Sequence, residues 1–330
     1  MKKIGFRAKK LCGGFLSPEC LPELEDLGVL NRLRAAGARP IRRVVLASPY
    51  HGKASADLPG EALSISRHRL DSILLDRARE TGTHVFEGVE KDPEEHGWTI
   101  MATGRSIRKK PSGTSYYGIQ AFFEPVDSVT DQVELDLIPG GYVGLVRQEM
   151  NQVNVCALLS SNHLRRYGPD LDHALREFMA LNSNLHAHLG SARRVGPWKA
   201  VGPVVMGLKR LVDGSRFFVG DAACMPDPFV GEGMAMGLIG ARLLANALLE
   251  SASPACAYED QWHRHFDHPL WLQKLLRTAM GHAGVQELVV RWCGLFPSSL
   301  RRLTEMTRSP ATESLRASAI GVVADARGTR

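Results

Sequence analysis

The sequence predicts a mixed α/β fold, and three stretches of the chain carry that prediction. The stretch from Arg216 to Glu250 contains a short apolar run, a loop with Gly and Pro, and then a long apolar helix. Residues 116–160 read as a series of antiparallel strands, and residues 253–330 as helices. Since ligands of open α/β sheets bind outside the carboxyl ends of the strands, we expect a ligand site just after a strand at 217–219.

The composition is that of a globular protein with a substantial core. The 330 residues form one large domain or two interlocked ones, and 44% of them are apolar. No uninterrupted apolar run is long enough to span a bilayer, and the basic N-terminus lacks the apolar segment of a signal peptide. The six cysteines include no Cys-x-x-Cys pair, which indicates reduced thiols in the cytoplasm rather than disulfides or a zinc site. The net charge of +6 is moderate, and no nucleic-acid module is recognisable.

The first 60 residues predict one helix and one strand. Ser17 is a good N-cap, Pro18 suits the first helical position, and Gly28 can end the helix. Alternating apolar residues predict a strand after residue 38, and residues 49–60, bounded by Pro and Gly, predict a loop.

The next 55 residues predict a strand that turns into a helix. Apolar residues at helical spacing place this helix over 70–78, Gly82 ends it, and Thr83 to Phe86 can form the next strand. Residues 91–96 form a charged turn, and a single strand's worth of residues separates this turn from a loop at 102–105.

The middle and the end of the chain predict a sheet and its covering helices. We expect strands at 119–124, 133–138, 142–146 and 153–159, with a turn at 139–141. Residues 170–190 predict one amphipathic helix that covers this sheet. After residue 252 we expect helices that cap the fold, with docking on a membrane surface as the alternative. His263, His265 and His268 lie close together there, but only two share a helical face, so we assign no metal ligands.

The predicted ligand site has a defined chemistry. Asp221 stands at the carboxyl end of the 217–219 strand, where its carboxylate can accept hydrogen bonds from a polyhydroxylated ligand. The helix that follows directs free N–H groups and a partial positive charge to the same place. Gly233, Gly237 and Ala241 recur every four residues and leave one helix face bare, so that backbone or a flat ring can approach it.

The run DPFVGEGMAMGL and the Gly-Asp pair before it resemble the C-terminal flavin motif of FAD-dependent oxidoreductases. The relatives meant are the aromatic-ring hydroxylases, the flavin halogenases and the geranylgeranyl reductases. The resemblance implies that Gly220 and Asp221 hold the ribityl chain of FAD. It also implies that the start of the helix faces the flavin ring, which assigns cofactor contacts to Pro228, Gly231, Glu232, Gly233 and Met234.

Three further patterns resemble the geranylgeranyl reductases and their neighbours. The Lys-x-Cys-Gly-Gly pattern that begins at Lys10 implies that Cys12 and Gly13 lie near the flavin, although Cys12 by itself reads as a buried small residue. An Arg-x-x-Leu-Asp pattern implies that Arg67 reaches the cofactor; a solvated arginine is the alternative. The run PGGYVGLVR matches a cavity motif in part, so Tyr142 either lines a substrate cavity or packs as an ordinary sheet residue.

The resemblance implies a glutathione-reductase-type FAD domain, incomplete and Rossmann-like, that is interrupted by a substrate domain. We expect a discontinuous FAD domain at 1–115 and 195–252, an antiparallel-sheet domain at 116–194 and a helical region at 253–330. No Gly-x-Gly-x-x-Gly occurs, although the βαβ unit that carries it needs roughly 30 residues. We expect a misassigned start, a truncated gene or a loss of tight FAD binding.

The resemblance implies an FAD-dependent oxidoreductase of the geranylgeranyl reductase type, with redox chemistry at flavin N5 on a hydrophobic substrate of the polyketide or isoprenoid kind. NAD(P)H is the electron donor that such enzymes suggest. We expect a cytoplasmic protein with no nucleic-acid partner. Three alternatives stay open: a flavin monooxygenase or halogenase of the same fold, a non-catalytic remnant, and a peripheral membrane protein. The Trp-x-Trp-x-Ile-Pro motif of halogenases is absent, and no residue is assigned to acid–base catalysis.

Overall fold

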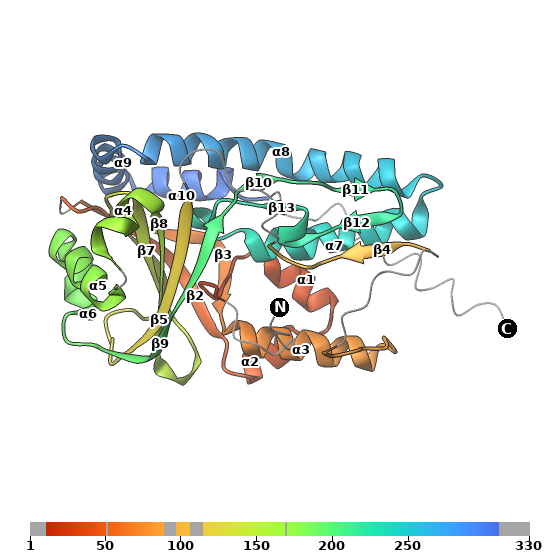
Figure 1. Ribbon diagram of the computed structural model, residues 1–330, viewed down its shortest axis with the longest axis horizontal. Coiled ribbons are helices and arrows are strands. Elements are labelled where there is room, and N and C mark those ends of the chain that lie inside the picture. Colours follow the sequence, from red (N-terminus) through yellow and green to blue (C-terminus); the bar gives the residue numbers. More distant parts are fainter. Residues whose placement is uncertain (1–10, 51, 89–96, 106–114, 169, 310–330) are drawn as a thin grey trace.

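The computed structural model describes residues 11–50, 52–88, 97–105, 115–168 and 170–309, and it confirms the mixed α/β fold (Figure 1). One large curled sheet has the strand order β1-β3-β2-β6-β7-β8-β5-β9. Its strands are β1 (Phe15–Leu16), β2 (Arg39–Ala47), β3 (Lys53–Ser64), β5 (Tyr116–Glu124), β6 (Gln132–Ile138), β7 (Gly141–Arg147), β8 (Val153–Ser160) and β9 (Arg193–Val204).

The four strands expected in residues 116–160 are all present and mutually antiparallel where they pair. The sheet does not stop there, because β2 pairs with β6 in parallel and brings Val44 opposite Val133. Strands from both sides of the expected boundary at residue 115 therefore share one sheet, while the domain boundaries themselves stay predictions. A short 3₁₀ turn, η1 (Glu149–Asn151), connects β7 to β8.

The loop expected at residues 49–60 is wrong, because most of it belongs to β3. The chain turns at residues 49 and 50, and β3 then runs antiparallel to β2 with Ala54 opposite Leu46. Ala54, Ala56 and Leu58 alternate with polar residues and are buried on one face of the sheet. An irregularity in β2 between Ile41 and Arg43 accommodates the opposing strand where it contains Pro and Gly.

Three local expectations need smaller corrections. Residues 83–86 form no strand, and the first helix begins at Cys20 rather than directly after Ser17, although Gly28 does follow its end with a φ of +71°. The single helix expected over 170–190 is two helices that meet at Asn182. The Asn182 side chain accepts hydrogen bonds from the first turn of the second helix and donates one to the carbonyl of Leu137, so it ends one helix and starts the next.

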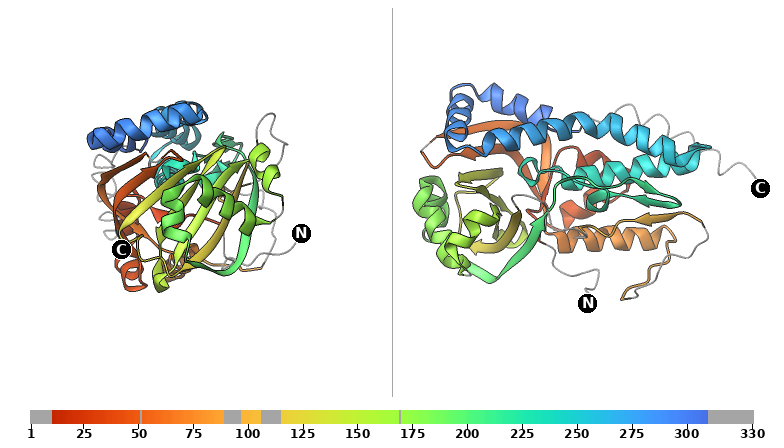
Figure 2. Two further views of the ribbon diagram at one scale, coloured as in Figure 1. Left: turned by 90° about the vertical axis from the view of Figure 1, so that its left-hand side faces the viewer. Right: turned by 45° about the horizontal axis from the view of Figure 1, so that its top comes forward.

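Helices cover the sheet on both sides (Figures 1 and 2). One hydrophobic cluster joins β5–β8 to the helices α5 and α6, as expected for residues 170–190. A second cluster joins β2 and β3 to the C-terminal helices α9 and α10. The helices are α1 (Cys20–Asp26), α2 (Leu30–Ala35), α3 (Arg67–Glu80), α4 (Ser161–Tyr167), α5 (Leu171–Leu181), α6 (Ser183–Leu189), α7 (Gly233–Glu250), α8 (Pro254–Met280), α9 (Ala283–Leu295) and α10 (Pro297–Met306).

A third hydrophobic cluster is built around α7. The helix packs against α1 and α8 and against a small sheet of β11 (Val212–Asp213), β12 (Arg216–Phe218) and β4 (Thr99–Met101), in which β12 and β4 are parallel. Beside it, β10 (Gly207–Leu208) pairs with β13 (Cys224–Met225). Among the described residues α7 alone is long and apolar enough to cross a bilayer. Its inner face instead belongs to the core, and its Arg242 forms an ion pair with the buried Glu23.

Candidate functional site

The chain makes a sharp turn at the carboxyl end of β12, where the sequence predicts the ligand site. Gly220 has a φ of +58° and begins a 3₁₀ turn, η2 (Gly220–Ala222). A Cβ atom on Gly237 of α7 would lie 3.8 Å from the Cα atom of Gly220. A methyl group would only just touch the turn at this distance, and larger side chains are kept out, so this face of α7 stays bare beside the turn.

Asp221 lies in this turn among three positively charged side chains. Burial raises the pKa of the Asp221 carboxyl group, while Arg105, Lys209 and Arg67 act in the opposite direction. The Lys209 ammonium also donates a hydrogen bond of 2.5 Å to the Asp221 carbonyl, and burial lowers the pKa of this lysine. The sequence predicted Asp221 and Arg67 here. The sequence placed Arg105 in a loop at 102–105 but assigned it no role, and Lys209 was missed, because nothing in its spacing places it beside β12.

Arg67 is the first residue of α3 and connects Asp221 to the segment around Cys12. Its guanidinium donates to both carboxylate oxygens of Asp71, over 3.0 and 3.2 Å, and also forms a hydrogen bond with the Cys12 side chain. Burial by itself lowers the pKa of Arg67, but the neighbouring Cys12 and Asp71 outweigh burial and the pKa is raised. The structure thus brings Cys12, Arg67 and Asp221 together from three distant segments, while their contacts with a cofactor stay predictions.

The loop of residues 12–14 is held by amide side chains from the large sheet. Gln120 of β5 and Asn154 of β8 donate to the carbonyl of Cys12 over 2.8 and 2.9 Å, and Asn154 also donates to the carbonyl of Gly13 over 2.7 Å. Gln120 further donates to the Asn154 side chain. Polar residues at inward positions of apolar strands are the sequence signal that could have revealed this contact.

A second contact fixes the same loop from the other side. Gln148 donates to the carbonyl of Gly13 over 3.2 Å, and its amide occupies the space that a side chain at Gly14 would need. Gly14 has a φ of +75°, so glycine is required at this position for two reasons. Within the described part of the chain, the buried side-chain oxygens of Gln120 and Gln148 have no hydrogen-bond partner.

The loop between β13 and α7 carries the other predicted cofactor residues. Pro228 starts a 3₁₀ turn, η3 (Pro228–Val230), and Gly231 follows with a φ of +72° against the ring of Phe15. The ring of Phe229 meets that of Tyr142 from β7 edge to face, with 5.3 Å between the centroids. Burial raises the pKa of Tyr142 well above its usual value. Tyr142 therefore packs directly on the predicted cofactor loop, and Gly233 and Met234 begin α7 just beyond it.

The carboxylate of Glu232 is engaged by the C-terminal segment. It lies 2.9 Å from Arg308, and Arg308 lies 3.0 Å from Glu19, so two carboxylates share one buried guanidinium. Burial and then the repulsion from Glu19 raise the pKa of Glu232 to about 8, although Arg308 opposes this. The sequence did not predict this ion pair, and a cofactor contact at this position would come from the backbone.

The site has the polar groups and the bare backbone that FAD requires. Asp221 can accept from ribityl hydroxyls. The three cations exceed the two carboxylates of Asp71 and Asp221 by one positive charge, which suits the negative charge of a dinucleotide. Gly220 and Gly237 leave room for close approach beside the start of α7. The residues present therefore fit the group. Lys10 and the expected charged turn at 91–96 lie outside the described residues.

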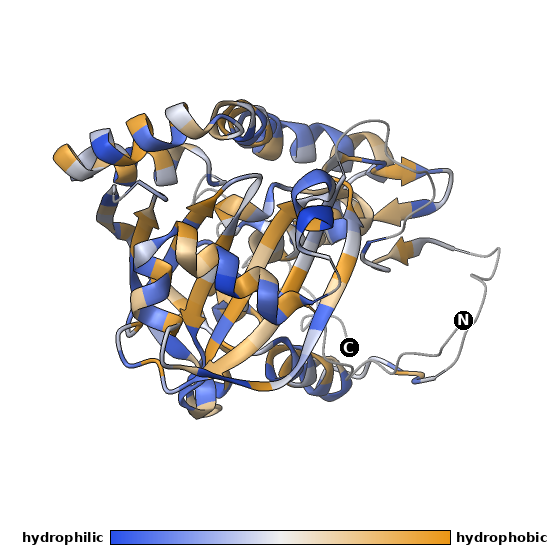
Figure 3. Ribbon diagram, turned by 60° about the vertical axis from the view of Figure 1, so that its left-hand side comes forward, coloured by the Kyte–Doolittle hydropathy of each residue, from blue (hydrophilic) through white to orange (hydrophobic). Residues whose placement is uncertain are grey.

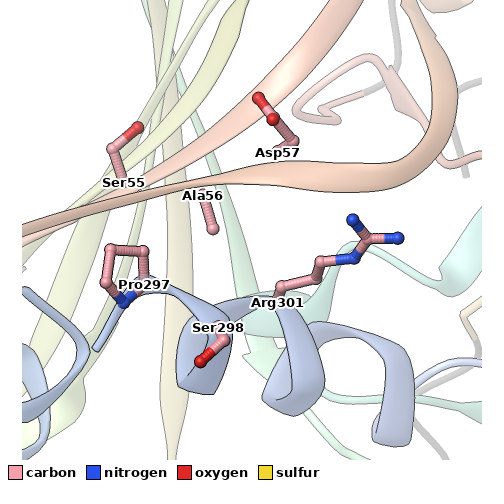
Figure 4. A pocket seen from close by; sticks show the side chains of 6 residues that line it. All are labelled: Ser55, Ala56, Asp57, Pro297, Ser298 and Arg301. Atoms are coloured by element: carbon pink, nitrogen blue, oxygen red, sulfur yellow. The ribbon is translucent and has the colours of Figure 1, made fainter.

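Two hollows of moderate size lie away from these residues. One of about 260 Å³ separates β3 from the start of α10 and is lined by Ser55, Ala56, Asp57, Pro297, Ser298 and Arg301 (Figure 4). The other, of about 360 Å³, lies beside the first turns of α3 and is lined by Ala36, His68, Arg69, Ser72 and Ile73. Neither contains a residue that the sequence assigned to the cofactor.

The structure also forms a serine–histidine–glutamate chain that spacing did not reveal. Ser128 Oγ lies 2.5 Å from His188 Nδ1, and His188 Nε2 lies 3.1 Å from Glu134 Oε1. Burial and the neighbouring Glu134 raise the pKa of Asp136 to about 7. These groups connect α6 to β6 and share no residue with the cluster around Asp221. Within the described ranges, no group of His, Cys, Asp and Glu side chains could hold a metal ion.

Comparison with known proteins supports the fold. No family model matches the chain. The chain is 23% identical over 226 residues to 1H-pyrrole-2-carbonyl-[peptidyl-carrier protein] chlorinase of Pseudomonas fluorescens, covering 57% of this chain and 50% of that protein. It is 28% identical over 139 residues to conditioned medium factor receptor 1 of Dictyostelium discoideum, covering 40% and 27%. The chain thus spans between about a quarter and a half of the length of these curated relatives.

Several solved structures match over most of their length. A triple mutant of the flavin-dependent brominase Bmp2 has a TM-score of 0.75 at 14% identity, covering 92% of this chain and 86% of that one. The myxobacterial FAD-dependent halogenase CndH gives 0.73 at 16% identity, with 92% and 83% covered. PqsL of Pseudomonas aeruginosa, described as a probable FAD-dependent monooxygenase, gives 0.67 at 15% identity, with 86% and 90% covered. The chain therefore has the fold of FAD-dependent halogenases and monooxygenases.

Proposed function

We propose that this chain is an FAD-dependent oxidoreductase that acts on a small hydrophobic molecule. The observation that carries the proposal is the position of Asp221 at the carboxyl end of β12, among Arg67, Arg105 and Lys209. This position is where open α/β sheets bind their ligands, and the fold is one that FAD-dependent enzymes use.

Each residue has a definite task in this proposal. Asp221 accepts hydrogen bonds from the ribityl hydroxyls, and the first turn of α7 directs its N–H groups at the ligand. Arg67 faces the site, and its bidentate contact with Asp71 fixes the orientation of its guanidinium. The loop of residues 12–14 is kept in place by Gln120, Asn154 and Gln148. When bound, the flavin supplies hydride or electron transfer at its N5 atom, and the chain supplies orientation and exclusion of water.

The substrate side of the site is aromatic and apolar. Tyr142 and Phe229 meet edge to face where the large sheet contacts the cofactor loop, and both are largely buried. Such a wall suits a flat or unsaturated hydrophobic molecule better than a charged one. PqsL, one structural neighbour, was solved in complex with 2-aminobenzoylacetate, whose aromatic ring agrees with this choice, although the compound also carries a carboxylate.

Two finer assignments follow from different observations. The Cys-Gly-Gly and Gly-Gly-Tyr patterns favour reduction of an isoprenoid-type double bond, with NAD(P)H as donor. The halogenase and monooxygenase neighbours favour a reaction with oxygen. Oxygen uptake by the purified protein with FAD and NADPH separates them, because the monooxygenase reaction consumes oxygen and the double-bond reduction does not.

The decisive test is the visible spectrum of the purified chain after incubation with FAD and removal of the excess. We expect a retained flavin band. We expect Asp221→Asn to lower the affinity for FAD at least about tenfold, which corresponds to the loss of one charge-assisted hydrogen bond. Asp213→Asn, in an exposed ion pair on the β11–β12 hairpin, is the matched control. A folded chain that retains no flavin would overturn the proposal. The alternative of a non-catalytic remnant would then apply.

A further inference from the structure

The outward face of α9 is apolar and has no covering element among the described residues. Leu288, Trp292, Leu295 and Phe296 form what we call the α9 patch, and their exposed fractions lie between 49% and 75%. The opposite face of the helix, with Gln286, Val290 and Cys293, is buried against β3. Sequence spacing thus divides α9 into a face that belongs to the core and a face that does not.

The patch is a fixed structural feature. The ring centroids of Trp292 and Phe296 are 4.5 Å apart, and the Trp292 indole N–H donates a hydrogen bond of 3.2 Å to Ser299 Oγ. Figure 2 (left) shows α9 lying across the outside of the molecule above the large sheet, and Figure 3 shows hydrophobic residues along its length. A monomeric protein rarely exposes a contiguous group of large apolar side chains without a use for it.

The surroundings of the patch are basic. Residues 268–309 contain six Lys or Arg residues and only two acidic residues. Among the basic residues, Lys274 and Arg302 are exposed, while the exposed Arg291 and Arg301 form ion pairs with Glu287 and Glu305. The preceding helix α8 adds two further exposed apolar side chains, Trp271 and Leu275, which lie one turn apart on one face.

We propose that the α9 patch docks on an anionic lipid membrane, with the helix lying in the plane of the interface. Interfacial helices have exposed Trp and Leu on one face and Lys and Arg around it. The helix α9 has this composition and lies flat against its own protein. The indole of Trp292 suits the headgroup level, and the flanking basic side chains reach anionic lipid phosphates. The exposed cations beside the apolar side chains favour an anionic lipid surface over a second copy of the chain, whose own patch would carry the same charges.

Docking would bring the candidate site to the membrane surface, because α8 and the segment after α10 contact the loop between β13 and α7 that belongs to this site. Gln273 and Arg277 of α8 bond to Asp227, and Arg308, after α10, bonds to Glu232. A hydrophobic substrate dissolved in the bilayer would then be offered close to the loop. The docking surface itself is independent of whether the chain binds FAD.

The test is co-sedimentation of the full chain with sucrose-loaded vesicles of phosphatidylcholine alone and of phosphatidylcholine with about one third phosphatidylserine. We expect binding to the mixed vesicles. We expect the double variant Leu288→Ser/Leu295→Ser to bind at least about tenfold more weakly. Leu249→Ser is the matched control, since Leu249 is 74% exposed but lies at the end of α7. Unchanged thermal melting must show that both variants are folded.

Salt and charge variants give the second arm of the test. Arg302→Gln with Lys274→Gln should weaken binding to the mixed vesicles and leave any binding to phosphatidylcholine unchanged. Binding to the mixed vesicles should persist in part at about 1 M salt, because the apolar contribution is not screened. Equal binding by wild type and the double leucine variant would overturn the proposal. So would a wild-type dimer that becomes a monomer in the double leucine variant without any vesicle binding.

Discussion

Replacing Glu232 by Gln is expected to change the free energy of unfolding little at pH 5 and to raise it at pH 9. In the folded protein the pKa of Glu232 is raised to about 8 from an ordinary value of 4.5, chiefly because the carboxyl group is buried. Between pH 4.5 and about pH 8 the folded state holds a proton that the unfolded state has released. The stability of the wild type therefore falls as the pH rises through this range. The loss is complete above the folded pKa.

The magnitude follows from the size of this shift. The difference between the ordinary pKa of 4.5 and the raised pKa of about 8 sets a ceiling of about 5 kcal/mol. Since Arg308 stays close to the ionised carboxylate and water can relax around it, we expect about 2–5 kcal/mol. The amide of Gln can still accept from Arg308, so the substitution removes the charge and keeps one hydrogen bond.

Urea denaturation of wild type and variant at pH 5 and pH 9 measures this difference, with Glu305→Gln in an exposed ion pair as the control. The same ΔΔG at both pH values would refute the raised pKa of Glu232 on which this prediction depends. Retention of FAD by the same variant would show that the Glu232 carboxylate is not needed to hold the cofactor.

Three further predictions concern the fold and the site. Asn182→Ala should lower the free energy of unfolding by about 1–3 kcal/mol in urea denaturation. The substitution removes the cap of α6 and leaves the buried carbonyl of Leu137 without its donor, so an unchanged midpoint would contradict this prediction. Gly237→Val should push α7 away from Gly220 and abolish flavin retention, and a variant with an unaltered flavin spectrum would show that the close approach is not needed. Arg67→Lys should weaken FAD binding about tenfold in a fluorescence titration, with little change in melting temperature. Lysine keeps the positive charge but cannot reproduce the bidentate contact with Asp71, so equal affinity for FAD would argue against a role of Arg67 in the site.

The parts of the fold that the sequence predicted correctly are those whose local pattern is unambiguous. The strands β5 to β8 have β-rich runs bounded by turn residues, and α3 and α7 have apolar spacing with glycine at a defined end. The errors share a physical cause. β3 was missed because Ala, Asp, Pro and Gly are weak strand formers, and its pairing with β2 supplies the stability that its propensity lacks. The break at Asn182 was missed because only the distant carbonyl of Leu137 shows why the helix ends there.

For the candidate site, the sequence alone identified Asp221, the glycines around it and the start of α7, because a strand, a sharp turn and a helix follow one another in a short stretch. Resemblance added Cys12 and Arg67. Only the tertiary structure placed Arg105, Lys209, Gln120 and Asn154 beside them. Gln120 and Asn154 lie 108 and 142 residues from Cys12 along the chain, so no local pattern connects them to it. Only the tertiary structure showed that Glu232 pairs with Arg308 and that α9 keeps an apolar face uncovered. Local periodicity fixes which face of an element is apolar, but the contacts made between distant segments decide what covers that face and which charges meet.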